Sequence, residues 1–146
     1  MNAMTVSDRG LALLREREGC RLAAYLCSAG VPTIGVGHTE SVALGDTCTQ
    51  EQATEWLRQD IGLAEAAIRQ NVRVPLKQHE FDALASFIFN VGVRAFTTST
   101  LLRKLNAGDY AGAALQLDRW HIPPEITSRR NGEREQFRGA RFEARI

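Results

Sequence analysis

Apolar side chains recur three or four residues apart over several long stretches of the chain, a spacing typical of helices that bury one face. The longest of these stretches runs from Thr49 to about Val72. Thr49 and Gln52 have the spacing of a capping box, so we expect the helix to begin there. At 1.5 Å per residue this helix would be over about 30 Å long, enough to join two lobes of a small protein.

More helices are predicted after the proline that ends this long helix. The segment 81–91 is apolar almost all round, so we expect a central, buried helix. Helices are also expected at 99–106 and 109–120, and two consecutive prolines make 121–126 a loop. The last helix, 127–138, mixes Arg with Glu. That composition predicts a solvated face with i,i+4 ion pairs. The more specific alternative is a contact with an anionic polymer.

The first helix of the chain places a carboxylate at its end. Ser7 is a possible N-cap, Leu11 and Leu14 have helical spacing, and Gly19 is a suitable stop because glycine accepts positive φ. Glu18 is then the last helical side chain, where the negative end of the helix dipole disfavours an ionised carboxylate. This position suits a general acid, and a solvated glutamate is the alternative.

The pattern changes after this helix to the period of two that marks strands. Short strands are expected at 22–26 and 31–37. One face of the second strand is apolar, and the other carries only Thr33 between Gly35 and Gly37. Two glycines on one strand face indicate that a ligand or another backbone comes close there. The Thr33 hydroxyl would then contact the ligand.

A carboxylate interrupts the apolar face of the long helix. Asp60 lies next to Ile61 on that face, where an unpaired charge would be costly. The nearest chemically sensible partner is His38, at the end of the second strand. We therefore predict that His38 and Asp60 form a stabilising ion pair.

Composition limits the classes of function. The chain has 146 residues, 44% of them apolar, which suits one or two small lobes with a shared core. A net charge of +1 gives no reason to expect nucleic acid or a membrane surface as partner. The N-terminus lacks an apolar signal segment, and no apolar run approaches the roughly 18 residues of a membrane span. We expect a protein made and folded in the cytoplasm.

Three cysteines, Cys20, Cys27 and Cys48, make an odd number in a chain without a signal segment, so free thiols are expected. A disulfide between Cys20 and Cys48 that leaves Cys27 free is the alternative. Neither a Cys-x-x-Cys nor a His-x-x-x-His spacing is present, so we expect no metal site.

The motif around the first strands resembles a known family. Eight residues separate Glu18 from Cys27, five separate Cys27 from Thr33, and the sequence T-I-G-x-G-H begins at Thr33. This spacing resembles the phage-type lysozymes, the endolysins of tailed phages in glycoside hydrolase family 24. The match continues with FDALASFIFNVG at 81–92, FTTSTLLRKLNAGDYAGAA at 96–114 and SRRNGERE near the end. It covers nearly the whole chain.

The resemblance implies an α+β, two-lobed lysozyme-like fold within a single domain that covers residues 1–146. A small antiparallel sheet would lie in an N-terminal catalytic lobe, at about 15–60. The long helix would join it to a helical lobe at about 73–146, which also includes the N-terminal helix. The substrate would lie between the lobes.

The resemblance also implies hydrolysis of the β-1,4 bond between N-acetylmuramic acid and N-acetylglucosamine in peptidoglycan, with lysis of the host cell as the result. The glycan strands would be the partner, reached from the host cytoplasm through a holin by release to the periplasm and cell wall. No cofactor is implied, and we expect a monomer.

Three residues take catalytic roles by this resemblance. Glu18 would be the catalytic acid, Cys27 would occupy the place of the family's aspartate or cysteine, and Thr33 would hold the attacking water. Glycoside hydrolysis normally sets a carboxylate opposite the acid, whereas a thiol of ordinary pKa is mostly protonated at pH 7. Cys27 could act as a base in its thiolate form, as a covalent nucleophile, or as a polar spacer, and the sequence leaves all three open.

The expected substrate contacts lie in both lobes. Gly35 and Gly37 would line the glycan site in the catalytic lobe. Phe89 and Asn90 would face the cleft from the helical lobe, as their counterparts in the family do, with a core phenylalanine as the alternative. Ser99 would contact substrate from the same lobe, and a helix N-cap is the equal alternative.

Two other classes of function remain as alternatives. Cys27, His38 and Asp60 are the residue types of a thiol hydrolase, so the protein could be a cell-wall peptidase with Cys27 as nucleophile. It could also be a peptidoglycan-binding protein that lost catalysis when the aspartate became a cysteine.

Overall fold

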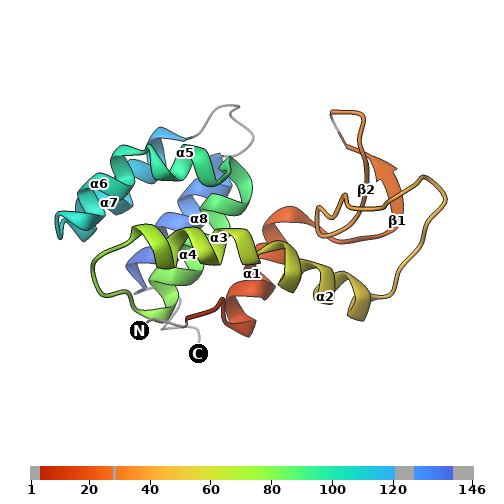
Figure 1. Ribbon diagram of the computed structural model, residues 1–146, viewed down its shortest axis with the longest axis horizontal. Helices are drawn as coiled ribbons and strands as arrows, with labels where there is room; N and C mark the ends of the chain where they lie inside the picture. Colours follow the sequence, from red (N-terminus) through yellow and green to blue (C-terminus); the bar gives the residue numbers. More distant parts are fainter. Residues whose placement is uncertain (1–3, 28, 121–126, 140–146) are drawn as a thin grey trace. The chain divides into compact units, whose positions relative to one another are not determined.

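The computed structural model describes residues 4–27, 29–120 and 127–139 (Figure 1). These residues are mostly helical and form one small antiparallel sheet of two strands, so the predicted α+β class is confirmed. The chain divides into two compact units. Leu11–Gly62 is called the sheet unit here, and Met1–Gly10 together with Leu63–Ile146 is called the helical unit.

Helix α1 (Asp8–Glu18) has the limits that its sequence predicts. The backbone N–H of Gly10 donates to Ser7 Oγ at 3.0 Å, as expected of an N-cap serine. Gly19 ends the helix with a φ of 77°, and its N–H donates to the carbonyl of Arg15 at 2.8 Å. Glu18 is therefore the last helical residue.

The sheet pairs β1 (Arg21–Leu26) with β2 (Pro32–Gly35). The second strand is shorter than predicted, because Gly35 adopts a φ of 64° and turns the chain. Ile34 and His38 then exchange two backbone hydrogen bonds of 2.9 Å, which close a tight turn.

The single long helix predicted from Thr49 to Val72 is two helices, α2 (Gln50–Asp60) and α3 (Gly62–Asn71). The capping box of Thr49 and Gln52 is present as predicted. The break falls at Ile61, just before a glycine, which is a poor helix former. Ile61 is fully buried and keeps the apolar spacing of the helix, so the sequence pattern does not indicate the break.

The helical unit is built around α4 (Gln78–Val91). All eight residues from 81 to 88 are buried, which confirms the predicted central helix. Two helices pack against it, α5 (Val93–Thr97) and α8 (Thr127–Arg138). The unit also contains α6 (Thr100–Asn106), α7 (Tyr110–Gln116) and the 3-10 turn η1 (Leu117–Arg119), of which α7 and η1 pack against α8. The loop predicted at 121–126 lies outside the described residues.

The prediction of a solvated face on α8 is wrong for its centre, which packs against α4. Arg130 and Glu133 are 1% and 0% exposed. Glu133 accepts hydrogen bonds from Arg129 Nε at 2.9 Å, Arg130 Nη1 at 2.7 Å and Ser86 Oγ at 2.6 Å. These donors compensate the carboxylate, so this polar face can enter the core of the unit.

The N-terminal segment is held in the helical unit by two buried carboxylates. The backbone N–H of Val6 donates to Glu65 Oε2 at 2.8 Å, and that of Ser7 donates to Asp82 Oδ1 at 3.1 Å. Gly10 lies so near the second carboxylate that a Cβ there would be 2.6 Å from Asp82 Cγ. This segment therefore depends on helices α3 and α4.

Candidate active site

The sheet unit contains the predicted acid, thiol and hydroxyl. Glu18 is half-buried and ends α1, and two residues separate it from β1. Cys27 follows β1 at its other end, where Leu26 pairs with Pro32. The pairing shifts register along β1, and an irregularity of this kind bends a strand and often occurs beside active sites.

The turn after β1 shapes the chemistry of Cys27. The pKa of its thiol is lowered, first by a hydrogen bond with the backbone of Val31 and then by one with the backbone of Ala29. Burial acts the other way, and the Thr33 hydroxyl lowers the pKa by less than burial raises it. Hydrogen bonds to the sulfur favour the thiolate. The turn therefore shifts the Cys27 thiol toward its thiolate form relative to an ordinary cysteine.

Thr33 lies within hydrogen-bonding distance of Cys27 and is more buried than predicted. The Thr33 residue is 3% exposed, and its Oγ1 donates to the carbonyl of Val31 at 2.9 Å. A hydroxyl has a single proton, so Thr33 can turn it toward either the carbonyl or a thiolate at Cys27. Thr33 is thus linked to the sulfur and does not stand on a bare strand face.

Both glycines of the motif have structural roles. Gly35 is buried against α2, and a Cβ there would be 3.2 Å from Ala53 Cβ. The close neighbour that two glycines on one strand face predict is, at Gly35, the helix α2. Gly37 is exposed with a φ of 71°, as the tight turn requires.

The predicted contact between His38 and Asp60 is present. The distance from His38 Nδ1 to Asp60 Oδ2 is 2.8 Å, and His38 is 7% exposed. The imidazole also stacks on the ring of Trp56, with centroids 4.6 Å apart and planes 7° apart. This pair fastens the end of the tight turn to α2. The hydrogen-bond partners found for Cys27 are Val31, Ala29 and Thr33, so the contacts described do not assemble the thiol, His38 and Asp60 into a triad.

The residues predicted to bind substrate from the helical unit have different surroundings. Phe89 is half-buried, and Asn90 is exposed with its Oδ1 accepting a hydrogen bond from Arg130. Ser99 is buried; its Oγ accepts from the N–H of Leu102 at 3.1 Å and donates to a carbonyl at 2.7 Å. Both hydrogen-bonding functions of Ser99 are occupied, which favours the N-cap alternative over a contact with substrate.

The three cysteines are free, as expected from the sequence. The pKa of the Cys48 thiol is raised, first by burial and then by the nearby Cys20 thiol. Within the described ranges, no group of three His, Cys, Asp or Glu side chains is arranged to hold a metal ion. Across the same residues, no helix has the length and apolar character needed to cross a membrane.

Comparisons with known proteins agree with this arrangement. The family model described as phage lysozyme matches residues 15–133. The endolysin of Acyrthosiphon pisum secondary endosymbiont phage 1 is 44% identical over 146 residues, which cover 94% of this chain and 100% of that protein.

Solved structures are similar over nearly the same span. A crystal structure of a mutant of the lysozyme of Salmonella phage P22 has 44% identity and a TM-score of 0.86, and the match covers 92% of this chain and 98% of that one. The muramidase domain of SpmX from Asticaccaulis excentricus has 36% identity and a TM-score of 0.85, with 91% and 97% covered.

These similarities define the class of the protein as a lysozyme, and they confirm the predicted lysozyme-like fold. The chain belongs to the phage lysozyme family. The resemblance inferred from the spacing of Glu18, Cys27 and Thr33 is thereby confirmed at the level of family and fold.

Proposed function

We propose that Glu18, Cys27 and Thr33 form the catalytic group with which this lysozyme hydrolyses peptidoglycan. Membership of the phage lysozyme family makes the protein a glycoside hydrolase of the bacterial cell wall. The bond cleaved would be the β-1,4 linkage between N-acetylmuramic acid and N-acetylglucosamine. The proposal assigns the chemistry of this cleavage to residues of the sheet unit.

The single observation that carries the assignment is the lowered pKa of the Cys27 thiol. A glycosidase needs a proton donor on one side of the bond and a negatively charged base or nucleophile on the other. A thiolate held by turn amides and by Thr33 supplies the second group without a second carboxylate. This supports a chemical role for the sulfur over the role of polar spacer.

In this mechanism Glu18 donates its proton to the glycosidic oxygen, so that the leaving sugar departs as an alcohol. The Cys27 thiolate then either removes a proton from an attacking water or bonds to the anomeric carbon. Thr33, linked to the sulfur, orients the water or the thiolate. The anomeric form of the first product separates the two routes, because inversion requires an activated water and retention a covalent adduct.

The setting of the reaction follows from the same proposal. The enzyme would be made in the host cytoplasm, reach the wall through a holin-dependent release, and act as a monomer on glycan strands. A net charge of +1 provides little general attraction to polyanions, which agrees with recognition of the wall by specific contacts.

The central experiment replaces Glu18 with glutamine and measures reducing ends released from purified peptidoglycan. We expect Glu18→Gln to lose activity by at least about 100-fold, since general acid catalysis contributes about 10²–10⁴-fold. Glu16→Gln, on an exposed residue of the same helix, is the matched control and should keep wild-type activity.

The assay also tests the two alternative classes. A peptidase would release new amino groups and no reducing ends, and it would keep most of its activity in Glu18→Gln. A binding protein would sediment with peptidoglycan and release neither. Full release of reducing ends by Glu18→Gln would refute the assignment of the acid.

A further inference from the structure

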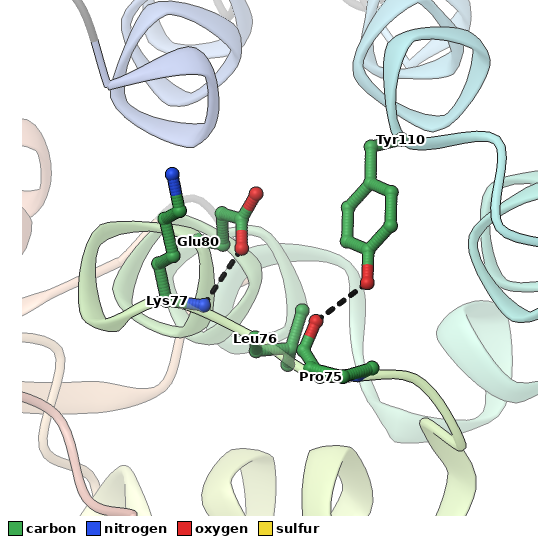
Figure 2. A pocket seen from close by; sticks show the side chains of 5 residues that line it. All are labelled: Pro75, Leu76, Lys77, Glu80 and Tyr110. Atoms are coloured by element: carbon green, nitrogen blue, oxygen red, sulfur yellow. Dashed lines mark hydrogen bonds between the residues drawn. The ribbon is translucent and has the colours of Figure 1, made fainter.

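A hollow of about 380 Å³ lies on the helical unit, between the chain leading into α4 and the start of α7 (Figure 2). The residues that line it are Pro75, Leu76, Lys77, Glu80 and Tyr110. All five belong to the helical unit, and none is in the proposed catalytic group. The volume falls within the range of ligand pockets, about 300–1,000 Å³. We call this hollow the α4–α7 pocket.

One wall of the α4–α7 pocket is the ring of Tyr110. Its hydroxyl donates to the carbonyl of Pro75 at 2.7 Å, so the polar atom of the phenol is already satisfied by the protein. The remaining surface of the ring is apolar and is fixed at both ends. A rigid aromatic wall can bind apolar groups at low cost in conformational entropy.

The wall facing Tyr110 carries two opposite charges, as Figure 2 shows. Glu80 Oε1 accepts the backbone N–H of Lys77 at 2.7 Å, which leaves its second oxygen available. Among the described residues, neither this oxygen nor the Lys77 ammonium has a side-chain partner. The pocket therefore offers one cation and one anion across from an apolar ring, with the Leu76 side chain also lining it.

We infer that the α4–α7 pocket binds the stem peptide of peptidoglycan, an inference that rests on the proposed function. A stem peptide carries free carboxylates, a free amino group and the methyl groups of alanine within a few residues. Those groups complement Lys77, Glu80 and the apolar surface of Tyr110, respectively. A glycan strand without its peptides carries the lactyl carboxylates of muramic acid but no cation, so it would leave the Glu80 carboxylate without a partner. Charge complementarity thus favours the peptide over the sugar.

The binding test uses the full-length protein and a synthetic tetrapeptide, L-Ala-γ-D-Glu-meso-diaminopimelate-D-Ala, in isothermal titration calorimetry. Lys77→Gln should weaken binding about three- to fivefold, the size expected for one partly exposed ion pair. Tyr110→Ala should weaken it about tenfold or more, because an aromatic anchor is lost. Lys104→Gln is the matched control, since it removes the same charge from a lysine outside the pocket.

Three results would overturn the inference. Wild-type protein could fail to bind the tetrapeptide at millimolar concentration. Lys77→Gln and Lys104→Gln could weaken binding equally, which would indicate a general effect of charge. Oligomers of N-acetylglucosamine could displace the tetrapeptide, or bind in its place with the same dependence on Tyr110, which would make the hollow a sugar site. Tyr110→Phe should retain most of the affinity, and it guards against misfolding as the cause of a loss in Tyr110→Ala.

The same variants separate this inference from the proposed function. Binding is measured in Glu18→Gln as well, so it does not depend on hydrolysis. On intact peptidoglycan, Lys77→Gln should raise KM more than it does on glycan strands stripped of their peptides. Hydrolysis without peptide binding would refute only the pocket, and peptide binding without hydrolysis would refute only the catalytic assignment.

Discussion

Removal of the Glu133 carboxylate should strongly destabilise the helical unit. The Glu133 side chain is 0% exposed and accepts hydrogen bonds from Ser86 Oγ and two guanidinium groups at 2.6–2.9 Å. In Glu133→Ala, the guanidinium groups of Arg129 and Arg130, whose side chains are 9% and 1% exposed, lose their shared counter-charge. Buried positive charge then faces a newly made cavity.

The expected loss follows from this burial. Removal of one partner from a buried ion pair costs about 3–5 kcal/mol, against a total stability of about 5–15 kcal/mol for a small protein. For a chain of this length each kcal/mol lowers the melting temperature by about 2–4 °C, so we expect a fall of about 6–20 °C.

Urea unfolding, followed by circular dichroism, measures the change in the free energy of unfolding. The matched control is Glu135→Ala on the same helix. Glu135 is 29% exposed and pairs with Arg134 and Arg138 at 3.3 and 3.2 Å, so its loss should cost at most about 1 kcal/mol. A loss in Glu133→Ala equal to that of the control would refute the reasoning that the buried cluster supports the fold.

Three further predictions concern the sheet unit. Iodoacetamide should abolish activity by modifying Cys27. Its reaction should persist to lower pH at Cys27 than at Cys48, because the thiolate exists above the pKa of the thiol, and that pKa is lowered at Cys27 and raised at Cys48. Full activity after complete alkylation, which mass spectrometry measures, would refute a chemical role for Cys27. Gly35→Ala should cost about 1–3 kcal/mol in unfolding experiments, and more than Gly30→Ala, since both have positive φ but only Gly35 has a close neighbour. Asp60→Ala should cost about 1–3 kcal/mol by removing the acceptor of a buried imidazole, and a melting temperature equal to that of wild type would contradict this.

Local patterns predicted the elements of this fold well. The capping box at Thr49, the stop at Gly19 and the limits 127–138 of the last helix each depend on neighbouring residues, so the sequence alone is sufficient. The break at Ile61 was missed because an apolar residue in helical conformation keeps the 3.6-residue pattern on both sides.

The candidate site was only partly predictable, because its chemistry depends on contacts distant from the motif. The spacing of Glu18, Cys27 and Thr33 identified the family, but the activation of the thiol comes from backbone groups of the turn, which carry no residue signature. A glycine in the turn that follows the thiol is the nearest sequence signal for this activation. At Gly35 the bare strand face predicts a close neighbour, but the sequence does not tell a sugar from a helix, and the structure shows helix α2 there.

The buried charges of the last helix were missed for a related reason. Arg130 and Glu133 have the spacing of an ordinary surface pair, three residues apart. Their burial depends on Ser86 in α4, some forty residues away, which supplies a further hydrogen bond. Composition alone does not reveal a partner at that distance.

The anchoring of the first residues has a consequence for how the protein is made. The amides of Val6 and Ser7 bond to Glu65 and Asp82, so these two hydrogen bonds cannot form until both carboxylates have been synthesised. At about 5–20 residues per second, a ribosome needs about 4–15 s to cover the interval between Ser7 and Asp82. The segment around Val6 and Ser7 is synthesised before its partners and is therefore among the last to reach its final place, and any peptide tag fused ahead of Thr5 would accompany it through that wait.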